Sequence, residues 1–560
     1  MATMNKKRGN VKMKEDTRKT VNHEGSVVHK LNTLETLFSK VLGSFFGEGT
    51  FYEKKTAEKD FKEIQKLIAE IPDEDIEYAL KVARIGREYN MIQYPLAVLT
   101  ACFNDDRFKG EDFLDENTGK NKLQTYSDYI VRRGKDILDV MAMQMNVFGF
   151  EVTTKGRGKN KTNHRQQPLP VQLRKSLRGK LESFNEYQLS KALGEGKEVS
   201  LADCVKLLRP NPAKSKVSED FFKRVIEGRV EFGGSEETKQ VQSELAKSKN
   251  KNNKATKVDV KKSIDTSTVM AIVKNLVALD RVGLLDDKEA VKSIVAKLTN
   301  AKEIQKSRLL PFRFYSAFQE VSILRNSAGK RQVMDALVEA LDLSIDNLQD
   351  IEGYSVILID CSGSMRSPVS GASNVTADVV ASMLGAIMFK KGIADVYVFG
   401  TSCKQVTDIS RKSTVMDIMN TIMRHNVGGG TDLALALKTL GKQSAKYDNL
   451  IILSDNDCYS MDSRSLGGFR FNRNSYLGSG YDTDTEINTL FTKKIIKKLY
   501  LDNLLGNSFA IANTDDYRKN LITGFSERVI DVINVYSSIG TGASDVRKVI
   551  DSIVETLPTR

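Results

Sequence analysis

The stretch 354-YSVILIDCSGSM-365 decides the fold of the second part of the chain. An apolar run ends at Asp360, and two serines follow at alternate positions, Ser362 and Ser364. A short apolar run that leads into small polar residues is typical of a buried strand followed by a loop. The pattern therefore predicts a strand that delivers one carboxylate and two hydroxyl groups to its own end.

The sequence around this stretch alternates between apolar runs and helical patterns. The predicted strands cover 356–359, 395–399, 449–455, 507–513 and 528–534, and the predicted helices cover 376–391, 414–424, 432–441, 485–499 and 543–556. Strands that are apolar throughout and alternate with helices indicate a parallel sheet covered on both faces. Residues 350–560 are therefore predicted to form a doubly wound α/β domain.

A metal site is predicted at the carboxyl ends of these strands, where such sheets bind ligands. Asp455 ends a second predicted strand, and Thr431 lies on the glycine-rich loop in 427-VGGGTDLALAL-437. The predicted ligands are hard oxygen donors, which suit Mg²⁺ or Mn²⁺ and disfavour zinc. They are Asp360, Ser362, Ser364, Thr431 and Asp455. The alternative is that Asp360 and the serines cap the next helix, as Asp and Ser often do.

The first 350 residues have a different pattern, in which apolar residues recur at helical spacing. Helices are predicted at 57–71, 73–90, 126–149, 168–192, 200–209, 218–230, 267–279, 285–300, 303–323 and 329–348. Many helices of this length without sustained heptads favour a stacked helical-repeat region over a coiled coil. We therefore divide the chain into a basic disordered arm (1–25), a helical region (26–348) and the α/β domain.

The charge of the chain is uneven. The formal net charge is +13, of which about +12 lies in residues 1–350 and about +1 in residues 351–560. This distribution indicates a polyanionic partner, most simply nucleic acid, although a charge that only aids solubility explains it equally well. The segment 153–180 is the clearest basic stretch, because it contains no acidic residue.

The composition argues against several other classes of protein. No apolar run approaches the ~20 residues that cross a bilayer, and no apolar stretch follows the basic N-terminus as a signal peptide requires. The five cysteines form no CxxC pair, which argues against a disulfide framework or a zinc site and for a reducing cytoplasm. The four histidines leave little material for catalysis that depends on histidine.

Two sets of motifs carry a resemblance to a known family. DCSGSM, GGGTD and ILSDND resemble the metal-ion-dependent adhesion site of a von Willebrand factor A (vWA) domain, and all five predicted ligands occupy its motif positions. The stretches 38–55, 168–193, 200–212, 267–279 and 308–318 are similar to parts of the TROVE domain. This order of domains is that of the Ro autoantigen family. The sequence departs from the family in the long insertion 459–485 and in RPNP, where a histidine often precedes the prolines.

The resemblance implies an α-helical, HEAT-like repeat ring, closed by the vWA domain and monomeric. It also implies a cytoplasmic, non-enzymatic scaffold that binds small noncoding (Y-like) RNA and the single-stranded 3′ ends of misfolded RNA. Such a scaffold would act in RNA quality control with an exoribonuclease such as polynucleotide phosphorylase. The residues expected to contact RNA lie in the acid-free segment, with Tyr187 or Phe184 available for stacking. They are Arg157, Lys159, Lys161, His164, Arg165, Arg174, Lys175 and Arg178.

Two rival functions remain open at this point. The first is a metal-dependent protein-adhesion module that does not bind RNA, which RNA affinity that falls steeply with salt would exclude. The second is a metal-dependent nuclease, since Asp432 and Asp457 lie beside the predicted ligands. The nuclease is disfavoured because the site offers mostly hydroxyl groups and because a two-metal nuclease needs more carboxylates.

Overall fold

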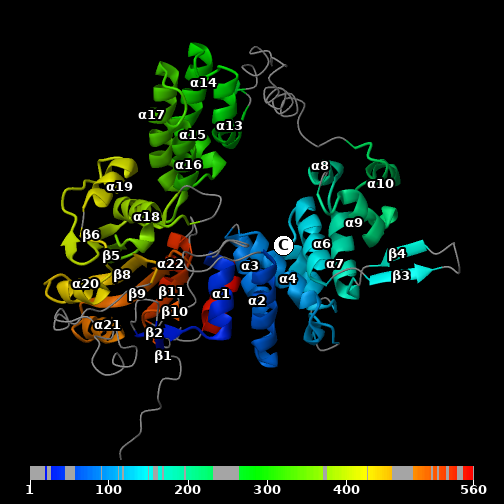
Figure 1. Cartoon of the computed structure of the whole chain (residues 1–560), viewed down its shortest axis with the longest axis horizontal. Helices are drawn as coiled ribbons and strands as arrows, with labels where there is room; N and C mark the ends of the chain where they lie inside the picture. Colours follow the sequence, from blue (N-terminus) through cyan, green and yellow to red (C-terminus); the bar gives the residue numbers. More distant parts are fainter. Residues whose placement is uncertain are drawn as a thin grey trace, which may run out of the picture.

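A computed structural model gives the architecture of the chain (Figure 1). It describes residues 19–21, 27–43, 57–89, 91–110, 113–116, 119–148, 151–155, 162–166, 169–194, 197–230, 264–265, 267–369, 375–425, 427–456, 483–505, 509–513, 516, 518–524, 529–538 and 546–558. A helical region comes first and an α/β domain follows, as the sequence predicts. None of the described helices is both long and apolar enough to cross a membrane.

The helical region is built from short helices that pack on their neighbours in the chain. Before residue 231 these are α1 (Thr33–Gly43), α2 (Ala57–Glu70), α3 (Glu77–Glu88), α4 (Gln93–Phe103), α5 (Lys122–Ile130), α6 (Gly134–Phe148), α7 (Val171–Ser183), α8 (Glu186–Ser190), α9 (Leu201–Leu208) and α10 (Glu219–Ile226). The second group is α13 (Val269–Arg281), α14 (Lys288–Leu298), α15 (Ala301–Ser307), α16 (Pro311–Ser322) and α17 (Ala328–Ser344). A hairpin of β3 (Glu151–Lys155) and β4 (Thr162–Gln166) leaves the first group.

Three predicted helices are divided in the structure. The helix predicted at 168–192 is divided into α7 and α8, because Phe184 has an extended backbone and the Asn185 side chain caps α8. The helix predicted at 126–149 is interrupted between α5 and α6, where the buried Asp136 carboxylate accepts hydrogen bonds from the backbone N–H groups of Arg132 and Arg133. The helix predicted at 303–323 ends at Ser307, and Pro311 begins α16. The Asp136 carboxylate thus satisfies backbone donors that a continuous helix would have satisfied internally, and Pro311 has no backbone donor to satisfy.

A six-stranded sheet forms the centre of the α/β domain, in the order β11-β9-β8-β5-β6-β7. All of its neighbouring strands are parallel except β6 and β7. The carboxyl ends of β5 and β8 therefore lie at one edge of the sheet. The strands are β5 (Tyr354–Asp360), β6 (Ile393–Phe399), β7 (Cys403–Gln405), β8 (Tyr447–Ser454), β9 (Ile496–Asn503) and β11 (Lys519–Thr523). The helices are α18 (Ala377–Lys391), α19 (Val415–Arg424), α20 (Leu433–Leu440), α21 (Thr483–Thr492), α22 (Val529–Ser538) and α23 (Val546–Thr556).

The sequence-based prediction is wrong at three places in this domain, and it missed β7 and β11. Of the strand predicted at 507–513, the structure describes only Phe509–Ala510 as a strand, which lies outside the six-stranded sheet. The helix predicted at 485–499 ends at Thr492, and Ile496 then begins β9. The strand predicted at 528–534 is the helix α22. Short apolar runs do not distinguish a buried strand from a buried helix, and only packing against the sheet decides between them.

The two ends of the chain each pack on the opposite part of the molecule. Strands β1 (Lys19–Val21) and β2 (Val27–Lys30) form an antiparallel sheet with β10 (Phe509–Ala510), so Lys19–Val21 departs from the disordered arm predicted for 1–25. Helix α23 packs on α3, where the Asp551 carboxylate accepts hydrogen bonds from Tyr78 (2.7 Å) and Lys81 (2.6 Å). The α/β domain thus joins the beginning and the end of the helical region, since it also contacts α17 through α19.

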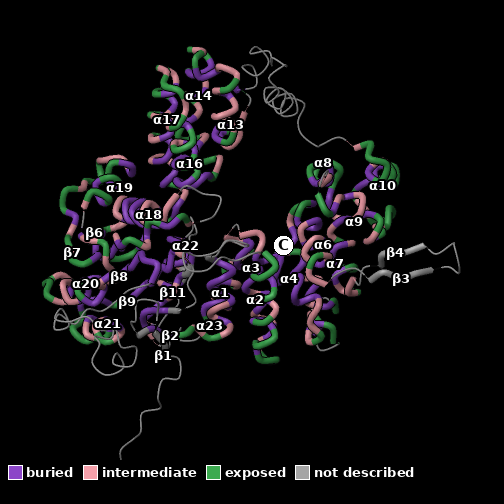
Figure 2. Tube along the Cα trace, in the orientation of Figure 1, coloured by how far each residue is buried: buried purple, intermediate pink, exposed green. Residues whose placement is uncertain are grey.

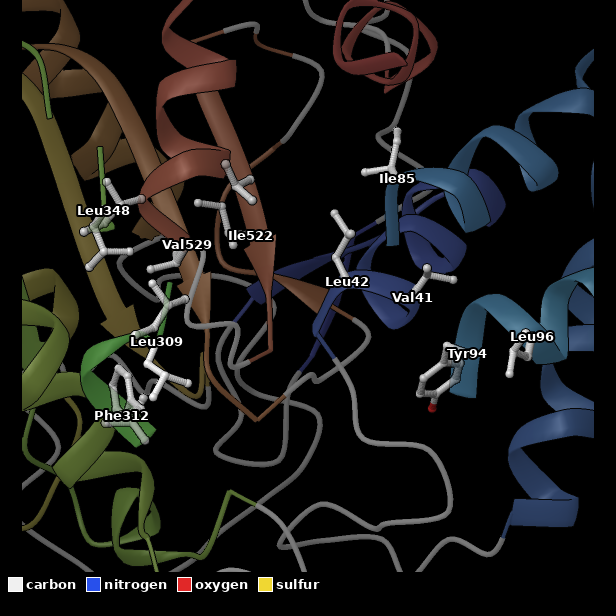
Figure 3. Packing of buried hydrophobic residues seen from close by; sticks show 14 of the residues in the cluster. Val41, Leu42, Ile85, Tyr94, Leu96, Leu309, Phe312, Leu348, Ile522 and Val529 are labelled. Atoms are coloured by element: carbon white, nitrogen blue, oxygen red, sulfur yellow. The ribbon is translucent and has the colours of Figure 1, made fainter. Parts of the chain in front are cut away.

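One hydrophobic core extends through the helical region and the α/β domain. Figure 3 shows side chains from α1, α3 and α4 in one cluster with side chains from α16, β11 and α22, among them Leu42, Phe312, Ile522 and Val529. The buried positions follow the inner faces of the helices and both faces of the sheet (Figure 2). The helical region and the α/β domain therefore share apolar contacts and are not joined only by a linker.

Asp502 on β9 is a buried acid without a hydrogen bond. It is 1% exposed, and neither carboxylate oxygen has a hydrogen-bond partner in the structure. Its neighbours on the adjacent strands are Leu453 and Ile522, and burial raises the pKa of its carboxyl group well above the usual value. A buried polar group without a partner costs about 1–3 kcal/mol of stability.

Replacing Asp502 with leucine is therefore expected to raise the melting temperature at pH 7. An acid whose pKa is raised by folding contributes its stability below about pH 4, and that contribution is lost as the pH rises toward the folded-state pKa. The gain in the Asp502→Leu variant should therefore grow from pH 4 to pH 7. Asp502→Asn is the matched control, which removes the charge but keeps a polar group. A gain that does not change with pH would contradict the assignment.

Candidate metal centre and basic surface

The Asp360 carboxylate at the end of β5 is held in place by hydrogen bonds from the protein. Its side chain is fully buried, and its Oδ1 accepts a hydrogen bond from the Ser362 backbone N–H at 2.8 Å. Its Oδ2 accepts a hydrogen bond from the Ser454 hydroxyl at 2.6 Å. Ser454 is not among the ligands predicted from the sequence, although it stands directly before Asp455 at the end of β8. This contact means that the carboxylate is oriented by two strands.

The two serine hydroxyls point toward one another, and a second loop lies beside them. Ser362 Oγ and Ser364 Oγ are 3.1 Å apart. The Gly363 N–H donates a hydrogen bond of 3.0 Å to the Gly429 carbonyl, which joins the serine loop to the glycine-rich loop that carries Thr431. Thr431 is itself buried, at 4% exposed. The structure thus brings the first and second predicted motifs together.

The glycine-rich loop also packs closely against the end of β6. A side chain at Gly400 would place its Cβ 2.4 Å from the Gly428 carbonyl oxygen. The Asp432 N–H donates a hydrogen bond of 2.9 Å to the Gly400 carbonyl. Gly400 was not singled out in the sequence, because only tertiary packing reveals that two backbones meet there.

Asp455 completes the predicted set. It is fully buried directly after β8, and it is close enough to Asp360 for their charges to interact. Burial, followed by the Asp455 charge, raises the pKa of Asp360 to about 7, against the opposing hydrogen bonds from Ser454 and Ser362. Two buried carboxylates that repel one another are an arrangement that a bound cation stabilises. The donor set therefore fits a divalent cation that prefers oxygen ligands.

The structure also tests the two other interpretations of these residues. Asp360 does not cap a helix, since it accepts from Ser362 and Ser454, and the following 3₁₀ turn at Ser364–Arg366 has no side-chain cap. Asp432 is occupied as the N-cap of α20, where it accepts from the Leu435 N–H at 2.9 Å. Asp457 lies outside the described residues. In the part of the chain that the structure describes, no group of three or more His, Cys, Asp or Glu side chains is placed to hold a metal ion.

The predicted RNA-contact residues are only partly described. Arg157, Lys159 and Lys161 lie outside the described residues, and so does most of the insertion 459–485. His164 and Arg165 are on β4, opposite Thr153 and Val152, and only their backbone is described.

The remaining cations of this set lie on α7. Arg174 and Lys175 are exposed and form no ion pair with a described residue. Arg178 has a structural role instead, because its Nε donates a hydrogen bond of 2.7 Å to the Leu208 carbonyl at the end of α9. Of the predicted set on this helix, Arg174 and Lys175 are therefore the exposed cations.

The two aromatic candidates differ in exposure. Phe184 is 5% exposed and belongs to the core, whereas Tyr187 is 52% exposed. The Lys191 ammonium group lies 3.9 Å from the centre of the Tyr187 ring. Of the two aromatic side chains, only Tyr187 is placed to stack on a ligand.

Two family models match this chain, one in the helical region and one in the α/β domain. Residues 264–353 match the TROVE domain model, and residues 355–476 match the Ro60 vWA domain model. "RNA-binding protein RO60" of Deinococcus radiodurans is 24% identical over 208 residues, which are 35% of this chain and 39% of that protein. The protein of the same name from Caenorhabditis elegans is 25% identical over 197 residues, which are 34% of this chain and 30% of that protein. The chain thus spans well under half the length of these curated relatives.

The fold has a similar counterpart over nearly its whole length. The crystal structure of the D. radiodurans RO (RSR) protein matches with a TM-score of 0.56 and 16% identity, over 94% of this chain and all of that one. The fold and the two matched models define a protein of the class that joins a helical TROVE region to a vWA domain. The chain therefore resembles the Ro family in both matched domains, in its curated relatives and in its fold.

Proposed function

We propose that this protein is a non-enzymatic RNA-binding scaffold. In this proposal the helical region binds structured, Y-like noncoding RNA and the single-stranded 3′ ends of misfolded RNA. The bound RNA would be passed to a partner exoribonuclease, such as polynucleotide phosphorylase, in the cytoplasm. The observation that carries the proposal is the pair of exposed cations Arg174 and Lys175 on α7, which form no ion pair with a described acid, in a chain whose positive charge lies mainly in its helical region.

The chemistry of this surface suits RNA. Neutralising phosphates releases condensed counterions, so a few unpaired cations supply affinity that depends strongly on salt and little on base sequence. The exposed ring of Tyr187, with Lys191 beside it, adds a surface on which an unpaired base can stack. Relatives that carry the name RNA-binding protein support the same conclusion.

We propose a separate role for the metal centre, namely contact with a protein partner. Asp360 and Asp455 would supply the charged ligands, and Ser362, Ser364 and Thr431 would supply hydroxyl oxygens to Mg²⁺ or Mn²⁺. The bound cation would supply a Lewis-acidic position for an outside carboxylate. The serine loop and the glycine-rich loop, joined through Gly363 and Gly429, would hold these oxygens in place.

An RNA-binding series at several salt concentrations tests the RNA function. The probes are a structured RNA with a single-stranded 3′ tail and the same RNA trimmed blunt. We expect tighter binding to the tailed RNA, and about tenfold weaker binding of both RNAs by the Arg174→Gln/Lys175→Gln variant. Its plot of log affinity against log salt should be shallower by about two, because about two phosphate contacts are lost.

The control replaces two exposed lysines of the vWA domain, Lys404→Gln and Lys412→Gln, with the same loss of charge. Equal affinity and salt dependence in wild type and the α7 variant would contradict the assignment of that surface. The same reactions report on enzymatic activity. Shortening of the labelled RNA by pure protein with Mg²⁺ would overturn the non-enzymatic role.

A further inference from the structure

A group of lysines lies at the amino-terminal edge of the sheet, opposite the metal centre. Two loops meet there, from α20 to β8 and from α21 to β9, and the Tyr447 N–H donates a 2.7 Å hydrogen bond to the Ile495 carbonyl between them. The ends of α20 and α21 also pack together, since a side chain at Gly441 would meet Leu490 at 3.5 Å. We call the exposed lysines on these loops the amino-edge lysine patch; they are Lys442, Lys446, Lys493 and Lys494.

The patch carries positive charge that no described acid neutralises. None of the four lysines forms an ion pair with a described residue. The two nearby acids are already paired, Asp448 with Lys497 at 2.6 Å and Glu486 with Lys438 at 3.8 Å. Four like charges on two adjoining loops repel one another, and a polyanion removes that repulsion.

Lys494 adds a second, independent observation. It follows α21 with a φ of 55°, in the left-handed region that disfavours side chains. The Lys494 N–H bonds the Phe491 carbonyl and the Ile495 N–H bonds the Leu490 carbonyl, which is the Schellman arrangement that usually has glycine at this position. A lysine here costs about 1 kcal/mol relative to glycine. Strain of this kind concentrates at functional positions.

We infer that the amino-edge lysine patch binds the sugar-phosphate backbone of an RNA helix. The patch contains no exposed large apolar side chain among the described residues, whereas a protein interface needs an apolar or aromatic centre. It also lacks an exposed aromatic ring on which unpaired bases would stack. Double-stranded RNA is recognised mostly through its shape and its phosphates.

This RNA contact is distinct from the surface on α7. Helices α20 and α21 lie on one side of the molecule, and α7 lies on the other (Figure 1). The inference rests on the proposed RNA-binding function and extends it, because it gives the vWA domain a helix-binding role separate from the helical region. A structured RNA would then contact the protein at two separated surfaces.

The test measures binding of the full chain to a blunt RNA duplex over a range of salt concentrations. The variant is Lys442→Gln/Lys446→Gln/Lys493→Gln/Lys494→Gly. We expect at least about tenfold weaker duplex binding at low salt, with a salt dependence shallower by about three to four. The single variant Lys494→Gly should bind the duplex more weakly yet melt at a higher temperature, because it loses the charge and relieves the strained backbone. That combination separates a binding role from damage to the fold.

The outcomes distinguish this inference from the proposed function. If the fourfold variant binds the duplex as tightly as wild type, the inference that the amino-edge lysine patch binds an RNA helix is wrong. This holds even if binding to the tailed RNA still depends on Arg174 and Lys175. Loss of duplex binding with tail-dependent binding retained would support it. Stronger binding of an acidic polyglutamate peptide than of duplex at the patch would overturn RNA as its ligand. The Lys404→Gln/Lys412→Gln control should match wild type.

Discussion

Replacing Asp360 with asparagine is expected to abolish binding of Mg²⁺ without unfolding the protein. Asparagine keeps the shape of the side chain but removes one of the two charged ligands of the proposed centre. Mutating a residue that only hydrogen-bonds to a metal ligand typically lowers metal affinity about 10–100-fold. Removing a ligand itself should therefore lower the affinity by at least about 100-fold. The variant also removes the repulsion between Asp360 and Asp455, so its melting temperature without metal should equal or exceed that of wild type.

Calorimetric titration with Mg²⁺ and thermal melting with and without the ion measure both effects. At a concentration about 100 times the dissociation constant, a bound ion stabilises the native state by about 2.7 kcal/mol. Wild type should therefore melt at a higher temperature with Mg²⁺, and the Asp360→Asn variant should not. Asp335→Asn, which neutralises an exposed acid on α17, is the matched control. An Asp360→Asn variant that binds Mg²⁺ as tightly as wild type would rule out the centre.

Replacing Gly329 with alanine is expected to cause a large loss of stability. Gly329 lies in the first turn of α17, where a Cβ atom would stand 1.9 Å from the Leu285 carbonyl oxygen and 2.8 Å from Val291 Cγ2. The obstacle is backbone, so α17 must move away from the turn before α14. We expect a loss of about 3 kcal/mol, at the upper end of overpacking effects.

The matched control for this substitution is Gly179→Ala in α7. A Cβ atom there meets nothing within 4 Å, so alanine should stabilise the helix by about 0.5–1 kcal/mol. Melting of the two variants should therefore change in opposite directions. A Gly329→Ala variant that melts with wild type would show that α17 does not need the close approach to Leu285.

Sequence reasoning located the metal motifs because they are local. Asp360 follows an apolar strand, Thr431 follows three glycines, and Asp455 ends another apolar strand, so strand ends and loop chemistry can be read without coordinates. Ser454 and Gly400 could not be found in this way. Their importance comes from contacts with Asp360 and Gly428, which are distant in sequence and meet only when the sheet has formed.

The misread boundary between α21 and β9 has a specific cause. Helix ends are usually recognised by glycine or proline, but α21 ends at Thr492 and the chain turns away at Lys494, whose left-handed backbone cannot be recognised in the sequence. The lysines on both sides of Ile495 and Ile496 then prolong a helical pattern across the start of the strand. The residue that concealed the boundary is also part of the amino-edge lysine patch.

The sequence by itself determined the two kinds of region in this protein and the order in which they occur, and it predicted the ligand set of the candidate metal centre. Hydrophobic periodicity and the residue types at strand ends are local properties, so they can be recognised from the sequence without a structure. The tertiary structure alone decided that β2 pairs with β10, that α23 packs on α3, and that Arg178 supports α9. It also decided which lysines of the vWA domain gather at one edge. These features depend on contacts between residues far apart in the chain, and such contacts are selected by packing in three dimensions.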